Sequence, residues 1–219
     1  MIICIKSALS PLDLSAIKEA VDQSVFVDGK HTAGWHAKQV KNNLQAKPNQ
    51  KGMQTVAARV SEVLMANEMF RLAARPRQLS PLLFSRYTEG MSYGNHVDAA
   101  FMNGLRTDLS FTIFLNRPDD YEGGELVLDM PHGEQEFKLD MGDVVVYPST
   151  TLHHVAPVIS GERLVCVGWA QSMVRRAEQR ELLFDLETAQ LALFAKEGKS
   201  QEFDLLSKSV SNLLRMWAE

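Results

Sequence analysis

The stretch "DLSFTIFLN" (residues 108–116) decides the fold. Within it, Leu109, Phe111 and Ile113 alternate with more polar side chains, which is the two-residue period of a β-strand that packs one face. Outward from it, between residues 79 and 171, short runs rich in Val, Leu, Phe and Tyr are separated by turn-forming segments such as "NRPDDYEGG" and "LDMGD". Several strands at this spacing predict a β core of the barrel or sandwich type.

The segments on both sides of this β core have helical patterns. Ser10 followed by Pro11 predicts a helix that runs to about residue 22. Apolar spacing predicts a second helix from residue 54 to the Arg75-Pro76 step. The polar stretch over residues 28–51 has no clear period and is expected to form loops. After residue 171, two apolar helical faces separated by "KEGKS" predict a helical hairpin.

These patterns divide the chain into three parts. Residues 1–78 form a mainly helical N-terminal part packed on the core, residues 79–174 the β core that is expected to carry the chemistry, and residues 175–219 a helical tail. The apolar faces of the tail are continuous and would otherwise be exposed. We therefore expect a homodimer that forms through the C-terminal helices.

Composition restricts the class of protein. The chain has 219 residues, 45% of them hydrophobic and 23% charged, which is ordinary for a globular protein. A formal net charge of −4 argues against a general affinity for nucleic acid, which needs a basic patch. The sequence contains no run of about 18 apolar residues, so we expect no membrane span. Cys4 and Cys166 are the only cysteines, too few for a disulfide framework, so we expect a cytoplasmic protein.

The segment "GNHVDAAF" contains a candidate metal site. If this segment is extended, His96 and Asp98 project from the same face of the strand. A third nitrogen ligand would complete the arrangement of two histidines and one carboxylate that is typical of non-haem iron(II) oxygenases. The candidates are His132, His153 and His154. His132 lies in a turn-like segment, whereas His153 and His154 begin an extended run that can hold a side chain rigidly. One of these two is therefore favoured as the third ligand.

Arg163 is the second chemical signal. It opens the strand "RLVCVGWAQ", where its own face otherwise carries Val165, Val167 and Trp169. A buried guanidinium is costly unless a carboxylate pairs with it, and its planar fork suits bidentate carboxylate recognition. A dicarboxylate could therefore bridge a metal and Arg163. The alternative is a strand-end arginine in solvent or paired with Glu162.

Several ordered motifs carry a family resemblance. "RYTEGMSYGNHVD", "DLSFTIFLN", "YEGGELVL" and "GDVVVYPSTTLHHVAPVISGERLVCVGWAQSMVR" resemble the iron(II)- and 2-oxoglutarate-dependent prolyl-4-hydroxylase-like superfamily, and within it the bacterial PKHD-type hydroxylases. The resemblance covers essentially the whole chain. It implies an α+β fold: a double-stranded β-helix (jelly-roll) core, N-terminal supporting helices and a C-terminal helical hairpin.

The resemblance also implies roles for individual residues. His96, Asp98 and His153 would hold Fe(2+) as the catalytic centre, and Arg163 would anchor the far carboxylate of 2-oxoglutarate. The choice of His153 over its neighbour follows the family pattern "LH-x-V-x-PV". Tyr87 resembles a tyrosine that hydrogen-bonds 2-oxoglutarate in relatives, although it could equally be an aromatic packed on a strand.

The implied reaction is hydroxylation of an unactivated C–H bond with O2, with release of succinate and CO2. The substrate, a small molecule or a peptide, is not identified by the sequence. The resemblance further implies L-ascorbate as a cofactor and a setting in iron uptake or iron homeostasis. Trp35, Asn42 and Asn43 of "AGWHAKQVKNNLQ" offer stacking and amide contacts to a substrate, or they tie down their own loop.

Two other functions stay open at this point. A zinc hydrolase could use His96, Asp98 and His153 with a bound water, but Arg163 would then have no obvious role. A non-enzymatic, cupin-like module that senses iron or a ligand could dock a partner through its helical tail. A regulator that binds DNA directly should show a basic helix, and the sequence contains none.

Overall fold

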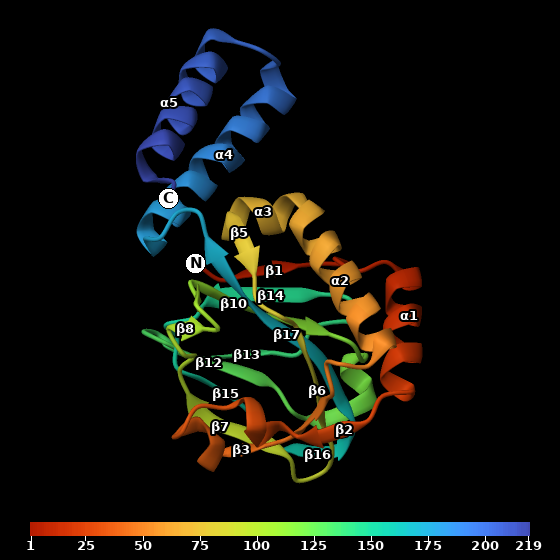
Figure 1. Cartoon of the computed structure of the whole chain (residues 1–219). Helices are drawn as coiled ribbons and strands as arrows, with labels where there is room; N and C mark the ends of the chain where they lie inside the picture. Colours follow the sequence, from red (N-terminus) through yellow and green to blue (C-terminus); the bar gives the residue numbers. More distant parts are fainter.

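The computed structural model describes residues 1–219, and two antiparallel sheets form its centre (Figure 1). The larger sheet contains, in spatial order, β1 (Ile3–Ile5), β14 (Val144–Pro148), β10 (Leu109–Phe114), β17 (Arg163–Ser172), β6 (Leu83–Tyr87), β4 (Leu44–Ala46) and β2 (Phe26–Asp28), with β5 (Pro76–Leu79) also paired to β17. The smaller sheet has the order β13 (Gly133–Phe137), β12 (Leu126–Met130), β15 (His153–Val155), β7 (Ser92–His96) and β3 (Lys41–Asn42). Two short sheets pair β11 (Tyr121–Gly123) with β16 (Val158–Gly161) and β8 (Phe101–Met102) with β9 (Leu105–Arg106).

The chain contains five α-helices. They are α1 (Pro11–Asp22), α2 (Lys51–Ala66), α3 (Glu68–Ala74), α4 (Ala177–Glu197) and α5 (Gln201–Trp217), and short 3-10 turns are η1 (Gly29–Thr32), η2 (Ala37–Gln39) and η3 (Pro118–Asp120). The first three helices pack on the larger sheet, and the last two form the hairpin predicted for the tail. The expected α+β class with a jelly-roll core is confirmed.

The first helix begins where the sequence predicts. Ser10 accepts a hydrogen bond from the Asp13 backbone amide, and the Asp13 carboxylate accepts one from the Ser10 amide. This reciprocal capping box satisfies two amides that the first turn leaves free.

Two predictions in the N-terminal part are wrong in detail. The helix expected from residue 54 to 74 is two helices, because Asn67 between them has extended backbone angles (φ −69°, ψ 122°) and caps α3 through Phe70 N. The stretch over residues 28–51 is not all loop, since it contributes β3 and β4. Strands of two or three residues are too short to show a period in the sequence.

The interior has two main apolar clusters. One lies between the larger sheet and the first three helices and includes Val60, Leu64, Phe70 and Phe111, each at most 1% exposed. The other lies within the β core, where both sheets contribute residues such as Leu128 and Val165. Polar side chains interrupt this second cluster in the space between the sheets. The candidate site lies there.

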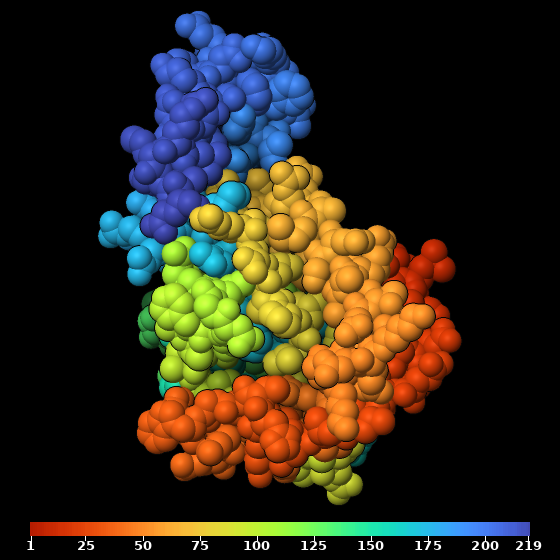
Figure 2. Space-filling model, viewed as in Figure 1, coloured from red at the N-terminus to blue at the C-terminus, as the bar shows by residue number.

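The C-terminal hairpin stands apart from the β core (Figure 2). Its base is held by an Arg75–Glu187 ion pair to the end of α3 and by a small cluster of Val174, Leu183 and Val210. The division into three parts at residues 78 and 174 stays a prediction. None of the helices combines the length and the apolar character that crossing a membrane requires.

Candidate functional site

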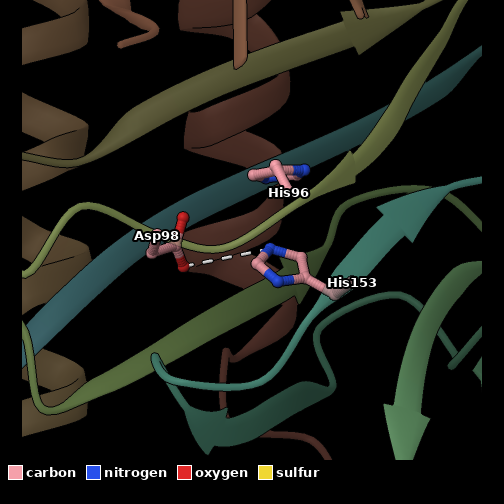
Figure 3. A group of neighbouring side chains, drawn as sticks. All are labelled: His96, Asp98 and His153. Atoms are coloured by element: carbon pink, nitrogen blue, oxygen red, sulfur yellow. Dashed lines mark ion pairs between the residues drawn. The ribbon is translucent and has the colours of Figure 1, made fainter. Parts of the chain in front are cut away.

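His96, Asp98 and His153 meet between the two sheets (Figure 3). His96 ends β7 and His153 begins the neighbouring strand β15, where the two are direct cross-strand partners. Asp98 follows two residues after His96, and its Oδ2 lies 3.9 Å from His153 Nε2. One ligand atom from each side chain lies within 4.8 Å of the others, so the three can surround one metal ion.

Each histidine is oriented by the backbone of its own segment. His96 Nδ1 lies 2.8 Å from the carbonyl oxygen of Gly94, and His153 Nδ1 lies 2.9 Å from that of Thr151. A carbonyl only accepts, so each Nδ1 carries a proton, and in the neutral ring Nε2 is the nitrogen left to bind a metal. This is the support that metal-binding histidines usually have.

Asp98 is held by serine hydroxyls. Ser110 Oγ in β10 donates to Asp98 Oδ2 at 2.5 Å, and Ser149 Oγ lies 2.8 Å from Ser110 Oγ. Both serines are at most 3% exposed. The sequence placed Ser110 on the more polar face of its strand, but it gave no signal that this face meets Asp98.

Burial keeps His96 neutral. Desolvation, followed by the nearby His153, lowers the pKa of His96 to about 4. Tyr93 stacks on the His96 ring with centroids 3.6 Å apart and an interplanar angle of 16°.

The other two candidate ligands lie elsewhere: His132 is exposed in a turn, and His154 neighbours His153 on the alternate side of β15.

Arg163 is buried at the start of β17, only 1% exposed. Its Nε and Nη1 have no hydrogen-bond partner. The predicted alternative partner, Glu162, instead pairs with Arg86 at 3.1 Å. Gly124 makes room for the guanidinium stem, because a Cβ at this position (φ +68°) would lie 3.0 Å from Arg163 Cδ. A buried cation with free donors is a suitable anchor for a carboxylate.

Tyr87 is the direct partner of Arg163 in the β6–β17 pairing. The guanidinium carbon lies 5.0 Å from the centroid of the Tyr87 ring, and the tyrosine is 4% exposed. Burial raises the pKa of the Tyr87 hydroxyl, which therefore stays protonated and able to donate. Tyr87 is thus both a packed aromatic and a wall of the site.

One cavity of about 1120 Å³ contains all five predicted site residues in its lining: His96, Asp98, His153, Arg163 and Tyr87. Typical small-molecule pockets measure roughly 300–1000 Å³. The cavity therefore has room for a second molecule beside a metal and a small dicarboxylate. The oxygen and nitrogen donors, the neutral His96 and the free guanidinium together fit an iron(II) ion and 2-oxoglutarate.

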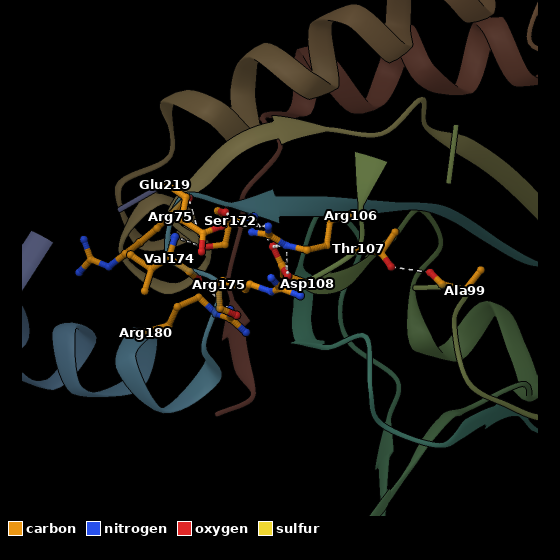
Figure 4. A network of polar contacts seen from close by, with 10 residues as sticks. All are labelled: Arg75, Ala99, Arg106, Thr107, Asp108, Ser172, Val174, Arg175, Arg180 and Glu219. Carbon is orange, nitrogen blue, oxygen red and sulfur yellow. Dashed lines mark hydrogen bonds and ion pairs between the residues drawn. The ribbon is translucent and has the colours of Figure 1, made fainter. Parts of the chain in front are cut away.

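A polar network anchors the loop that follows Asp98 (Figure 4). Thr107 Oγ1 donates to the carbonyl of Ala99, and Arg106 Nε donates to Asp108 at 2.8 Å. Asp108 also accepts from Ser172 N at 2.8 Å, and Arg106 Nη1 lies 3.2 Å from a Glu219 carboxylate oxygen. The loop is therefore tied both to β17 and to Glu219, which follows α5.

Comparisons with known proteins find related families. The sequence model of the 2OG-Fe(II) oxygenase superfamily matches residues 82–171, and that of the PKHD-type hydroxylase C-terminal domain matches residues 178–219. A PKHD-type hydroxylase of Acaryochloris marina is 53% identical over 219 residues, which is 100% of both chains.

Solved structures share the fold. A prolyl hydroxylase from Trichoplax adhaerens, in complex with a hypoxia inducible factor peptide fragment, has a TM-score of 0.59 at 15% identity over 83% of this chain and 86% of that one. HygX from Streptomyces hygroscopicus, with nickel and 2-oxoglutarate bound, has a TM-score of 0.56 at 13% identity, covering 79% and 84%.

Proposed function

The chain belongs to the PKHD-type hydroxylases of the 2OG-Fe(II) oxygenase superfamily, and from this membership we propose that it holds iron(II) through His96, Asp98 and His153. The observation that carries the proposal is the set of three converging donors, with both histidines buried and bonded through Nδ1, so that Nε2 faces the other ligands. Two imidazoles and one carboxylate leave three coordination positions open, enough for a bidentate cosubstrate and O2.

Arg163 is the proposed anchor for the far carboxylate of 2-oxoglutarate. Its two unpartnered donor nitrogens support this role, because a bound carboxylate would satisfy them and offset the cost of the buried charge. Tyr87 lies against the same guanidinium and is the proposed second contact to the cosubstrate. The apolar neighbours Phe114 and Val165 exclude water from this end of the site.

When bound, iron and 2-oxoglutarate supply the oxidising chemistry that, with O2, hydroxylates a C–H bond and releases succinate and CO2. The task of the protein is to aim the substrate and keep the site dry. Ser110 holds the Asp98 carboxylate, and the stacked Tyr93 holds the His96 ring. The zinc-hydrolase alternative leaves Arg163 unused, and family membership favours the hydroxylase over both alternatives.

The test is anaerobic addition of iron(II) and 2-oxoglutarate to the full-length protein. We expect a visible charge-transfer absorption from the iron chelate. Arg163→Ala should shift the 2-oxoglutarate dependence of this band to higher concentration, while His153→Ala should abolish it. Absence of the band from the wild-type protein, with zinc retained instead, would contradict the proposal.

Three further points belong to the proposal. L-ascorbate as a cofactor and a setting in iron homeostasis rest on the family resemblance alone. A cytoplasmic location is supported by the free thiols of Cys4 and Cys166.

The proposed substrate is a small molecule or a peptide. A mass-spectrometric search for a 16 Da gain after incubation with cell extract would test the reaction class directly.

We also propose a homodimer formed through the C-terminal hairpin. Leu191 and Phe194 on α4 are 49% and 50% exposed, and Leu205 on α5 is 54% exposed. Large apolar side chains gathered on one projecting element are typical of an interface. Light scattering should show that the double change of Leu191 and Phe194 to Lys converts a dimer to a monomer. The control Leu12→Lys, on α1 and 84% exposed, should leave the dimer intact.

A further inference from the structure

Lys41 lies in the same cavity, on the side of the smaller sheet, and the proposed chemistry gives it no role. It belongs to β3, which pairs with β7 at one edge of that sheet (Figure 1). Lys41 is the direct cross-strand partner of Tyr93, whose ring stacks on His96. Although lysine is normally an exposed residue, Lys41 is only 6% exposed and lines the cavity.

The ammonium group of Lys41 lacks an ionic partner. Its Nζ donates to Thr32 Oγ1 at 3.0 Å and lies 5.0 Å from the centroid of the Tyr93 ring, and it forms no ion pair. An ammonium has three donors, so this single hydrogen bond leaves two of them free. Burial lowers the pKa of Lys41 to about 8, and the more distant charges of Asp98 and Asp28 act against this shift. The cost of the buried charge is therefore only partly offset within the protein.

The neighbours of Lys41 are polar and already engaged with one another. Thr32 Oγ1 lies 2.7 Å from Gln45 Oε1, and Gln45 Nε2 donates to Ser85 Oγ at 3.3 Å. Asn43, 2% exposed and also in the cavity lining, lies within hydrogen-bond reach of the Tyr87 hydroxyl, which lies beside Arg163. On this wall of the cavity, the Lys41 ammonium is thus the group that is free to bind an acidic group of a ligand.

We infer that Lys41, supported by Thr32, binds a carboxylate of the substrate that is hydroxylated. The inference rests on the proposed function, because it assumes that Arg163 takes the cosubstrate. Lys41 and Arg163 lie on different sheets, on β3 and β17. A singly charged carboxylate matches a single ammonium, whereas phosphate groups are usually met by several cations or backbone amides. The substrate class is therefore an organic acid or a peptide with an acidic group.

The test uses the full-length protein with iron(II) and saturating 2-oxoglutarate under anaerobic conditions, so that Arg163 is occupied. The probes are matched pairs: hexanoate with hexanamide, and 4-phenylbutanoate with 4-phenylbutanamide. Ligand-observed NMR titration should show the wild-type protein binding the acid about 10-fold more tightly than the amide, as expected for one charge-assisted hydrogen bond. Lys41→Met and Lys41→Gln should reduce this ratio to about one.

Three controls make the result specific. Lys41→Arg keeps the charge and should retain most of the preference for the acid. Lys38→Met removes an exposed charge from the nearby η2 turn, outside the cavity lining, and should change nothing. Phenylpropyl phosphate is the comparison for a doubly charged group. If the wild-type protein binds it more tightly than the carboxylates, the assignment is overturned.

The outcomes separate this inference from the proposed function. If the wild-type protein gives no charge-transfer band, the proposed function has failed. If the band forms but no acid is preferred over its amide, or the preference survives in both neutral Lys41 variants, the inference on Lys41 is overturned alone. A weaker affinity for 2-oxoglutarate in those variants would also overturn it, because Lys41 would then serve the cosubstrate.

Discussion

His96 and His153 are direct cross-strand partners, with ring centroids 4.2 Å apart and both Nδ1 atoms bonded to backbone carbonyls. Burial and the neighbouring His153 lower the pKa of His96, so His96 is neutral near pH 7. Its Nε2 is therefore unprotonated before any metal binds, and its burial in this form also affects the stability of the protein.

The metal-free protein should lose stability in mild acid. Burial and His153 lower the pKa of His96 from 6.5 to about 4, so the unfolded chain binds more protons between these values. The free energy of unfolding should be unaffected above about pH 6.5 and should fall, by on the order of 2–3 kcal/mol, as the pH drops toward 4. Denaturation in the presence of a chelator measures this, with His96→Phe expected to flatten the pH dependence. An unchanged slope in His96→Phe, or the same flattening in the exposed control His132→Phe, would contradict it.

Ser110→Ala should weaken metal binding. The change removes the hydroxyl that donates to Asp98 Oδ2, and loss of such a supporting contact typically costs about 10- to 100-fold in metal affinity. Competition with a chromogenic chelator measures the affinity. Ser149→Ala, which touches the carboxylate only through Ser110, should have a smaller effect. Equal affinities for Ser110→Ala and wild type would show that Asp98 does not need this support.

Arg163→Met should separate stability from cosubstrate binding. Without 2-oxoglutarate, the variant should melt at the same temperature as the wild type or higher, because a buried cation with unpartnered donors has been removed. The increase in melting temperature that 2-oxoglutarate gives the wild type should be lost. Arg86→Met, whose side chain pairs with Glu162 outside the site, should keep that increase. A ligand-induced shift retained by Arg163→Met would remove Arg163 from the site.

Arg106→Met should loosen the loop beside Asp98. Arg106 pairs with Asp108 in a largely buried position, with side-chain exposures of 16% and 8%, so its loss should cost about 1–3 kcal/mol. Hydrogen exchange should increase most over residues 99–108. Arg77→Met, whose guanidinium contacts only the Glu219 carbonyl, is the matched control. Equal hydrogen-exchange rates over residues 99–108 in the two variants would show that the network does not organise the loop.

The sequence predicted the parts of this fold that depend on long patterns. The strand over 108–116, the first helix and the tail hairpin each show a period or a cap, and each is present. The break at Asn67 was missed, because a side-chain cap in the middle of an apolar helical pattern leaves that pattern unchanged. The strands β3 and β4 were missed because their pairing partners, not their own residues, define them.

The candidate site divides in the same way. Family motifs pointed to His96, Asp98, His153 and Arg163, and the structure brings the first three within reach of one ion. The supporting contacts could not be predicted, because Ser110 meets Asp98 only through the pairing of distant strands. Lys41 lay in a stretch expected to be loop, where a charged residue is ordinarily solvated.

The proposed metal ligands His96 and His153 belong to the smaller sheet, while Arg163 belongs to the larger. A cosubstrate bound to the metal at one end and to Arg163 at the other would therefore link the two sheets. Succinate lacks the 2-keto oxygen and would bind the metal through a carboxylate alone, so the product would link the two sheets less firmly than 2-oxoglutarate does.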